Sequence, residues 1–245
     1  MRQLLPTPLD NVDPLDVYRD LPTATGRPGL RLNMIASLDG ATAVEGVSGA
    51  LGGPADLRVF RTLRSLADLI LVAAGTARAE IYGAVRLPEE LVQARLDRRQ
   101  PEVPRLAIVS RSLGLDWDSP LFSEATQATI VVTVASAPAG ELRRAADVGE
   151  VLVAGDADVD MTLALECLGR LGVASVLAEG GPTLNGQLAA ANVLDELCLT
   201  LAPYLASGDS KRILAGRALG VPARVRVASL LEDEGVLFLR ARPEA

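Results

Sequence analysis

The strongest candidate for a ligand-binding site in the sequence is a glutamate followed by two glycines and a proline. Residues 173–187 read VASVLAEGGPTLNGQ, so an apolar, β-branched run ends at Glu179 and Pro182 takes the first position of a helix. The glycines allow a sharp turn and a close backbone approach to another group. The free N–H groups of Thr183 and Leu184, at the positive end of the helix dipole, would then face an anion. The corner predicts a site for a nucleotide pyrophosphate with one carboxylate beside it, although plain strand-to-helix connections share this pattern.

Three more stretches combine polar side chains and glycines at the ends of apolar runs. Asp39, in MIASLDG, follows the first such run, at the strand end where open α/β sheets bind ligands. The glycine-rich loop 46–53, read GVSGALGG, suits a phosphate cradle or a mobile lid. In AAGTARAE, Thr76 is a candidate N-cap and Glu80 falls in the first turns of a helix. Common turns and flexible connectors have the same composition, but a second strand–glycine–helix corner favours the nucleotide interpretation.

The helix after the glycine-rich loop carries Arg58, Arg61 and Arg64, with Phe60 on its apolar side. At a spacing of three residues each arginine is displaced about 60° from the last, so the three form a slanting band. A solvated helix face is one interpretation of this band. The other is that the arginine nearest to the glycine-rich loop or to the following strand holds a phosphate through its planar fork.

The residue types that are missing narrow the chemistry. The 245-residue chain has no histidine, which excludes Ser–His–Asp and Cys–His catalysis and zinc sites with a histidine ligand, including those of zinc deaminases. The two cysteines, Cys167 and Cys198, lie in apolar contexts and are expected to be buried structural thiols. With so few acid–base groups, we expect a bound cofactor to carry the chemistry and no metal site.

Composition and charge indicate a globular protein that acts on a small molecule. Hydrophobic residues make up 49% and charged residues 22%, and the net charge of −7 argues against nucleic-acid binding, so any basic site must be local. Residues 1–20 lack a basic stretch followed by an apolar core, so no signal peptide is expected. No apolar run is long enough for a membrane span, and we expect a cytoplasmic protein.

The motifs lie on an alternation of short apolar strands and helices, which predicts a mainly parallel sheet covered on both faces. The expected strands are Leu30–Ala36, Leu69–Ala73, Arg105–Ser110, Thr129–Val134, Val151–Ala154 and Ala174–Glu179, and the expected helices are Pro54–Ala67, Pro88–Arg99, Glu141–Ala146, Met161–Leu171 and Pro182–Ala190. Three further strands without a long helix, which predict an antiparallel finish at one side, are Glu196–Ala202, Ala223–Leu230 and Val236–Ala241. We expect one domain over residues 1–245, with an irregular lead-in over residues 1–29.

Four motifs occur in one order from about Arg31 to the end: L-x-x-x-A-S-L-D-G, the S-G loop with its arginine-bearing helix, G-T-x-x-A-E, and E-G-G-P-T-L-N-G with V-L-D-E-L-C-L-T-L-A-P-Y. Together they resemble the riboflavin-biosynthesis reductase family, which comprises the C-terminal reductase half of the bifunctional riboflavin deaminase/reductase and stand-alone relatives. The chain is most similar to stand-alone actinobacterial pyrimidine-reductase-like proteins, some of which also act on dihydrofolate. The resemblance implies an α/β fold like that of dihydrofolate reductase. It also implies a homodimer that covers the apolar edge and face area left by the strands Glu196–Ala202 and Val236–Ala241.

The resemblance also implies an NADPH site and a substrate site. The residues that would contact NADPH are Ala36, Ala50, Thr76, Glu80, Ser110, Gly180, Gly181, Pro182, Thr183, Leu184, Asn185, Gly186 and Gln187. The residues that would contact a ribosylamino-pyrimidine phosphate are Ser48, Arg64, Arg86 and Glu179, with both arginines at the phosphate. Hydride would pass from nicotinamide C4 to C1 of the ring-opened sugar and give a ribityl chain. Asp39 and Glu179 are the candidate groups for a proton role, with water as the alternative.

Departures from the family pattern affect the expected substrate more than the fold. The bulky aromatic residue that the family has after Ser48 is Ala50 here, and Ile81 follows Glu80 where many members have a second acid. The zinc deaminase domain of the bifunctional members is absent, so only the reductase step is expected. Three functions remain open: a pyrimidine reductase of riboflavin biosynthesis, a reductase of the same fold that acts on dihydrofolate or another pteridine, and a nucleotide-binding module without catalysis.

Overall fold

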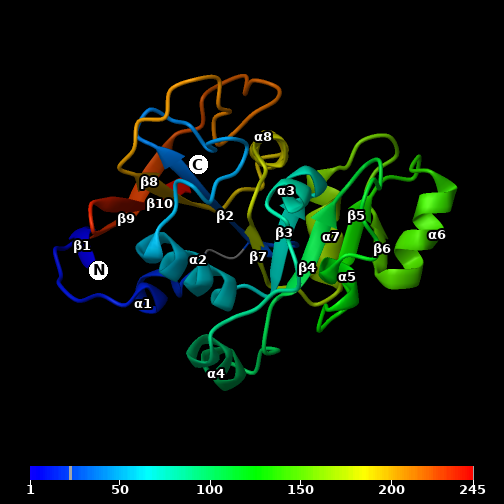
Figure 1. Cartoon of the computed structure of the whole chain (residues 1–245), viewed down its shortest axis with the longest axis horizontal. Coiled ribbons are helices and arrows are strands. Elements are labelled where there is room, and N and C mark those ends of the chain that lie inside the picture. The colour runs from blue at the N-terminus through cyan, green and yellow to red at the C-terminus, as the bar shows by residue number, and fades with distance from the viewer. Residues whose placement is uncertain (22–23, 245) are drawn as a thin grey trace.

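One ten-stranded sheet runs through the computed structural model, which describes residues 1–21 and 24–244 (Figure 1). The strands are β1 (Arg2–Leu5), β2 (Gly29–Ser37), β3 (Leu69–Ala73), β4 (Arg105–Val109), β5 (Ile130–Thr133), β6 (Glu150–Val153), β7 (Ser175–Ala178), β8 (Glu196–Ala202), β9 (Val225–Asp233) and β10 (Val236–Pro243). They lie in the order β1-β9-β10-β8-β2-β7-β3-β4-β5-β6. The strands from β8 to β6 run parallel, and β10, β9 and β1 continue the sheet antiparallel. The expected α/β class with antiparallel C-terminal strands is confirmed.

Helices connect and cover these strands. They are α1 (Pro14–Tyr18), α2 (Pro54–Leu66), α3 (Ala74–Ala79), α4 (Glu89–Asp97), α5 (Pro120–Ser123), α6 (Ala139–Val148), α7 (Met161–Arg170) and α8 (Pro182–Ala190). Both α2 and α8 begin at a proline, because proline fixes the backbone for the first helical position and needs no N–H partner there. Within the described residues, every helix is too short or too polar to cross a membrane.

Alternate residues of the central strands face two different apolar layers. On β3, Leu71 packs in the cluster that contains Leu165 of α7 and Leu184 of α8. Its neighbour Ile70 packs in the opposite cluster with Ala77 of α3. Burying a leucine or isoleucine side chain is worth about 1.5–3 kcal/mol, and a slip of one residue would turn each side chain to the opposite layer and disrupt the packing of both. This alternation holds the strand ends, and the residues that follow them, in a fixed register.

The predicted irregular lead-in over residues 1–29 contains two regular elements in its described part. The strand β1 pairs antiparallel with β9, and α1 buries Tyr18 against residues of α2, β9 and β10. The guanidinium group of Arg31 donates to the C=O of Tyr18 at 2.8 Å and to Glu196 at 2.6 Å. A four-residue strand and a five-residue helix are too short to show periodicity, and their partners lie at the other end of the chain.

The C-terminal strands are also not the sheet edges that were expected to drive dimerisation. The strand β8 lies between β10 and β2, and β10 lies between β9 and β8. The edges of the sheet are β1 and β6. Because β1 pairs only with Leu230–Glu232, the earlier part of β9 has no described partner on that side. On the antiparallel side of the sheet, an exposed edge is therefore at residues 225–229 of β9 and not on β8 or β10.

Three adjacent strands, β2, β7 and β3, point their carboxyl ends at the same side of the sheet (Figure 1). The chain passes from β2 through α2 to β3, and it returns to the place between them only with β7. Such a change in strand order leaves a crevice beyond the strand ends, where open α/β sheets bind ligands. The loop 38–53, the helix α3, and Glu179 with α8 follow these three strands and surround that crevice.

Candidate active site

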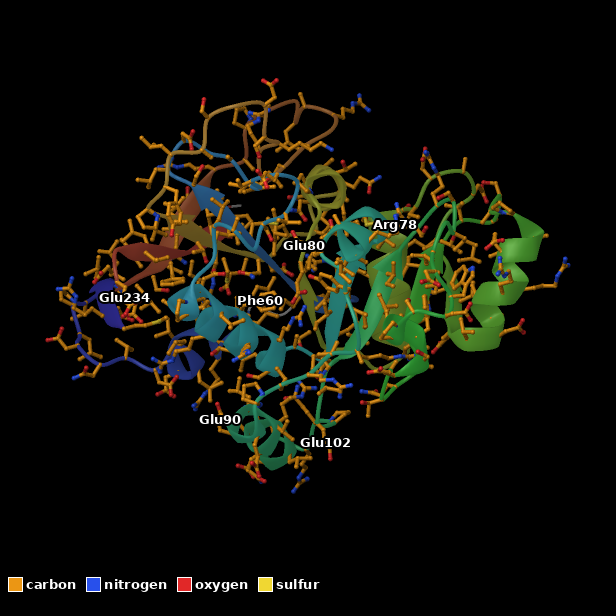
Figure 2. The ribbon with its side chains drawn as sticks, viewed as in Figure 1. Phe60, Arg78, Glu80, Glu90, Glu102 and Glu234 are labelled. Carbon is orange, nitrogen blue, oxygen red and sulfur yellow. The ribbon has the colours of Figure 1, made fainter. Side chains whose placement is uncertain are left out.

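A cavity of about 1160 Å³ lies at this crevice. It is bordered by parts of the loop 42–53, by one side of α2, by residues 75–85, by residues 179–182 and by residues 206–211. Figure 2 labels Phe60 on α2 and Glu80 directly after α3, two residues that line it from different elements. Small-molecule pockets usually measure about 300–1,000 Å³, so this cavity has room for a nucleotide and a second ligand.

The most strongly bonded group in the cavity is the carboxylate of Glu179, the residue after β7. Its Oε1 accepts a hydrogen bond from Arg64 Nε, and its Oε2 accepts one from Arg64 Nη2, both at 2.7 Å. The hydroxyl of Tyr82 donates to Oε2 at 2.7 Å as well. The guanidinium lies 4.1 Å from the centroid of the Phe60 ring. With side-chain exposures of 2% for Glu179 and 16% for Arg64, this is a largely buried ion pair in a fork-to-fork arrangement.

The electrostatics of the ion pair fix the protonation of both partners of Glu179. Burial by itself would lower the pKa of Arg64, but the adjacent Glu179 charge raises it above its usual range. Burial, and then the charge of Glu179, raise the pKa of Tyr82 well above its ordinary value. Arg64 is therefore a cation and Tyr82 a hydrogen-bond donor at neutral pH, and both hold the Glu179 carboxylate in place.

The structure gives Arg64 a different partner from the expected substrate phosphate. Two donors on one side of its guanidinium already bind Glu179, so the fork cannot grip a phosphate in the same way while the pair persists. The sequence showed an arginine at the C-terminal end of α2, but not that the strand carrying Glu179 lies beside it. Tyr82 was missed for the same reason, and Phe60, assigned to the apolar side, instead stacks on Arg64.

The Gly–Gly–Pro corner contacts the other strand–helix corner directly. Gly180 has φ +86° and accepts a hydrogen bond from the N–H of Ala73 at 2.7 Å. A Cβ on Gly181 would lie 2.5 Å from Thr76 Oγ1, so a larger residue at this position would require the Thr76 side chain to move. Thr76, Gly181 and Pro182 all line the cavity. Thr76 is not the N-cap that was expected, since α3 begins at Ala74 and Thr76 lies inside it.

The second half of the EGGPTLNG motif holds a loop instead of lining the cavity. The side chain of Leu184 is in the core, and Asn185 Nδ2 donates to the C=O of Ile213 at 2.8 Å. A Cβ on Gly186 would lie 2.0 Å from the C=O of Ala215. These residues therefore pack the segment 210–216 against α8, while Thr183 and Gln187 are exposed outside the cavity lining. Of residues 180–187, which the resemblance assigns to NADPH, only Gly181 and Pro182 line the cavity.

Two predicted site residues from distant parts of the sequence do meet. The main-chain N–H of Ser48 donates to Glu80 Oε1 at 2.7 Å, and both residues line the cavity. This hydrogen bond connects the glycine-rich loop to the end of α3. The carboxylate of Glu80 therefore positions the loop over the cavity.

Four further predicted contacts, outside residues 180–187, do not line the cavity. Arg86 pairs with Glu124 at 2.8 Å, and its side chain is 75% exposed. Ala36 is buried within β2, and Ala50 is exposed in the loop. Ser110 is buried after β4, where its Oγ accepts a hydrogen bond from a main-chain N–H three residues later. The order of residues showed which strand ends they follow, but not the direction of each side chain.

Asp39 holds a loop and does not line the cavity. Its carboxylate accepts hydrogen bonds from the hydroxyl of Ser37 and from the N–H groups of Ala206 and Ser207. These bonds, that of Ser37 above all, lower the pKa of Asp39 to about 2. Asp39 is therefore ionised at neutral pH and unsuited to donate a proton. The role that its bonds support is to fix the segment beginning at residue 206 against the end of β2.

Comparison with known proteins identifies the family. Residues 28–236 match the family described as RibD C-terminal domain. A relative from Archaeoglobus fulgidus, named 2,5-diamino-6-ribosylamino-4(3H)-pyrimidinone 5′-phosphate reductase, is 31% identical over 202 residues, which cover 81% of this chain and 91% of that protein. The crystal structure of a pyrimidine reductase-like protein from Corynebacterium diphtheriae is similar, with a TM-score of 0.84 at 29% identity, covering 96% of this chain and 99% of that one.

The fold is shared more widely. Dihydrofolate reductase from Enterococcus faecalis, in a complex with NADP(H), has a TM-score of 0.51 at 12% identity, covering 91% of this chain and all of that one. This match confirms the expected dihydrofolate-reductase-like fold, and the matches above confirm the expected family. The chain belongs to the RibD C-terminal domain family of riboflavin-biosynthesis reductases.

Proposed function

We propose that this chain is an NADPH-dependent reductase that converts the ribosyl group of a ribosylamino-pyrimidine 5′-phosphate to a ribityl group. The observation that carries the proposal is the buried Glu179 acceptor, held by Arg64 and Tyr82, in one cavity with the Gly181 corner. The name of the Archaeoglobus fulgidus relative, a reductase of such a phosphate, supports the substrate class.

The glycines around the cavity fit a nucleotide. Gly49, Gly53 and Gly75 line it, and a Cβ on any of them would meet no protein atom within 4 Å. None of the three has a positive φ. Neither backbone conformation nor internal packing therefore requires glycine there, which is consistent with space kept open for a ligand that approaches the backbone. The NADP(H) complex of a protein with the same fold also supports a nicotinamide cofactor.

Different residues of the cavity would bind the two ligands. The corner formed by Thr76, Gly181 and Pro182, at the positive end of the α8 dipole, would hold the phosphates of NADPH through close backbone approach. When bound, NADPH supplies the hydride for C1 of the ring-opened sugar. Glu179 accepts hydrogen bonds from sugar hydroxyl or pyrimidine amino groups, and Arg64 and Tyr82 keep it oriented. Water is assigned as the proton source, because Asp39 is outside the cavity with a pKa of about 2.

The proposal is tested by NADPH oxidation with the purified protein. We expect consumption of NADPH with the ribosylamino-pyrimidine 5′-phosphate, and formation of the ribityl product by mass spectrometry. Dihydrofolate serves as the comparison substrate. Turnover of dihydrofolate alone would overturn the substrate, and tight NADPH binding without turnover of either compound would favour a binding module.

We further propose a homodimer and a cytoplasmic location. The exposed edge of β9 supports a partner chain, since unpaired strand edges with apolar side chains are usually covered. Both cysteines are free thiols, as is common in the reducing cytoplasm.

A further inference from the structure

Lys211 is the only lysine among the 24 Lys and Arg residues of the chain, and it lines the cavity. All the other side-chain cations are arginines. Lysine differs from arginine in having a compact ammonium on a flexible stem, with three donors that can turn toward a single anionic group. The one side chain of this kind is therefore beside the space that the proposed ligands would occupy.

Lys211 is the cation in the cavity lining that is available to bind an anionic ligand. Five carboxylates line it, those of Glu45, Asp56, Glu80, Glu179 and Asp209, against two cations, Arg64 and Lys211. Arg64 is engaged with Glu179 through two hydrogen bonds. Lys211 is exposed and has no ion pair within residues 1–21 and 24–244. An anionic ligand in such an acidic cavity needs a local positive charge, and Lys211 supplies it.

The backbone around Lys211 is fixed on two sides. Its C=O accepts a hydrogen bond from Thr42 Oγ1 at 2.9 Å, and the hydroxyl of Ser210 accepts one from the N–H of Thr42 at 3.0 Å. On the other side, the N–H of Ala215 donates to the C=O of Pro182 at 2.9 Å. The segment 210–215 thus extends from the loop after β2 to the first turn of α8. Lys211 and Pro182, at the first position of α8, line the same cavity.

We propose that the ammonium of Lys211 binds a phosphate group of a ligand held in this cavity. The assignment rests on the proposed function, because both proposed ligands carry phosphate: NADPH and the pyrimidine 5′-phosphate. Because Arg64 is paired with Glu179, Lys211 is the cation of this cavity that would bind the phosphate of the substrate or cofactor.

A single lysine allows a direct test by amine labelling. Reductive methylation can modify Lys211 Nζ and the terminal amine, and peptide mass spectrometry measures the two separately. We expect NADPH or ribose 5-phosphate, at concentrations shown to saturate binding, to slow methylation of Lys211 at least several-fold. Ribose should leave the rate unchanged, and the terminal amine is the internal control. Protection by NADPH alone assigns the cofactor phosphate, and protection by ribose 5-phosphate assigns the substrate phosphate. If neither NADPH nor ribose 5-phosphate at saturation slows methylation of Lys211 relative to the ligand-free protein, the proposal is overturned.

Variants give the second measurement. Lys211→Ala should weaken binding of the assigned ligand about 10- to 100-fold, the range expected for a lost charge-assisted hydrogen bond. Lys211→Arg should recover part of the affinity, and Arg212→Ala, which removes the adjacent exposed charge outside the cavity lining, should not change it. Affinity is read by nicotinamide fluorescence and by isothermal titration with ribose 5-phosphate. Equal affinities for the alanine variants at 211 and 212 would refute the role of Lys211. Neither readout requires turnover. If the ligands protect Lys211 but the protein does not oxidise NADPH, the proposed reaction is refuted and the role of Lys211 is not.

Discussion

The central residue-scale feature is a carboxylate that is almost fully removed from water. Glu179 has 2% side-chain exposure, and desolvation of a carboxylate costs several kcal/mol unless opposite charge and hydrogen bonds compensate it. Arg64 provides the charge and Tyr82 a further hydrogen bond. Removing Arg64 would leave the carboxylate buried without its counter-charge, so the pair matters for stability as well as for ligand orientation.

Arg64→Ala is therefore expected to lower the free energy of unfolding by about 3–5 kcal/mol. Arg61→Ala, at an exposed position of the same helix, should change it by less than about 0.5 kcal/mol. Urea unfolding measures both. Adding Glu179→Gln to Arg64→Ala should recover most of the loss, because the amide carries no charge. If the double variant is as unstable as Arg64→Ala, packing on Phe60 and not charge explains the effect.

The two thiols should differ in reactivity. Cys198 is buried, and this burial raises its pKa from 9.0 to about 12, whereas Cys167 is half-buried on α7. A thiol reagent at pH 8 should modify Cys167 in the native protein and both cysteines in denaturant, as counted by mass spectrometry. Because the folded state raises the pKa of Cys198, its contribution to stability is complete below about pH 9 and is lost as pH rises toward 12. Rapid native modification of Cys198 would contradict this assignment.

At the scale of elements, apolar runs predicted the strands of the parallel sheet and helical patterns predicted the longer helices, whereas the short elements β1 and α5 were not predicted. The strands at Leu69–Ala73 and Glu196–Ala202 and the helix at Pro182–Ala190 have the predicted bounds, because apolar runs and an N1 proline mark them. The six-residue helix α3 was recognised only as a corner, and its start was misplaced toward Thr76. The direction of single side chains, such as that of Arg86, depends on tertiary neighbours and was not predictable from spacing.

The first turn of α3 offers a substitution that separates ligand binding from folding. Gly75 is the second residue of α3, and a Cβ there would meet no protein atom within 4 Å. Gly140 is the second residue of α6 with equally open space, and it is not part of the cavity lining.

Gly75→Ala and Gly140→Ala should each leave the free energy of unfolding unchanged or raise it by up to about 1 kcal/mol. Only Gly75→Ala should weaken NADPH binding, by about 10- to 100-fold, because its methyl group occupies space that the nucleotide needs. Chemical unfolding and fluorescence titration give the two readouts. Unchanged NADPH affinity in a folded Gly75→Ala protein would remove this corner from the cofactor site.

At the scale of the whole molecule, the site exists only because the sheet assembles in this order. Ser48, Arg64, Tyr82, Glu179 and Lys211 come from five separated segments, brought together where β2, β7 and β3 end. Sequence motifs predicted four of these segments, since each follows a strand or begins a helix. The ion pair and the role of the segment 210–215 depend on strand order, which periodicity alone does not define. The single lysine was visible in the sequence, but its position at the cavity was not.

Strand order also changes where a second chain would attach. The C-terminal strands β8 and β10 are interior, so the expected dimer surface moves to the part of β9 that extends past β1. Val225 and Val227 are 46% and 42% exposed there. Pairing of this edge with its copy around a two-fold axis would satisfy free main-chain groups and cover both valines. The opposite edge, β6, carries Val153 with the same 46% exposure and provides a matched control.

Light scattering at micromolar concentration should therefore give the mass of two chains. Val227→Glu should give one chain, because it buries a charge without a partner in the interface, while Val153→Glu should remain dimeric. Circular dichroism checks that both variants are folded. A wild-type monomer would refute the homodimer, and dissociation by Val153→Glu alone would move the interface to β6. Because the cavity lining comes from neither Val225 nor Val227, a folded Val227→Glu monomer should keep its NADPH affinity; loss of that affinity would mean that the dimer contributes to the site.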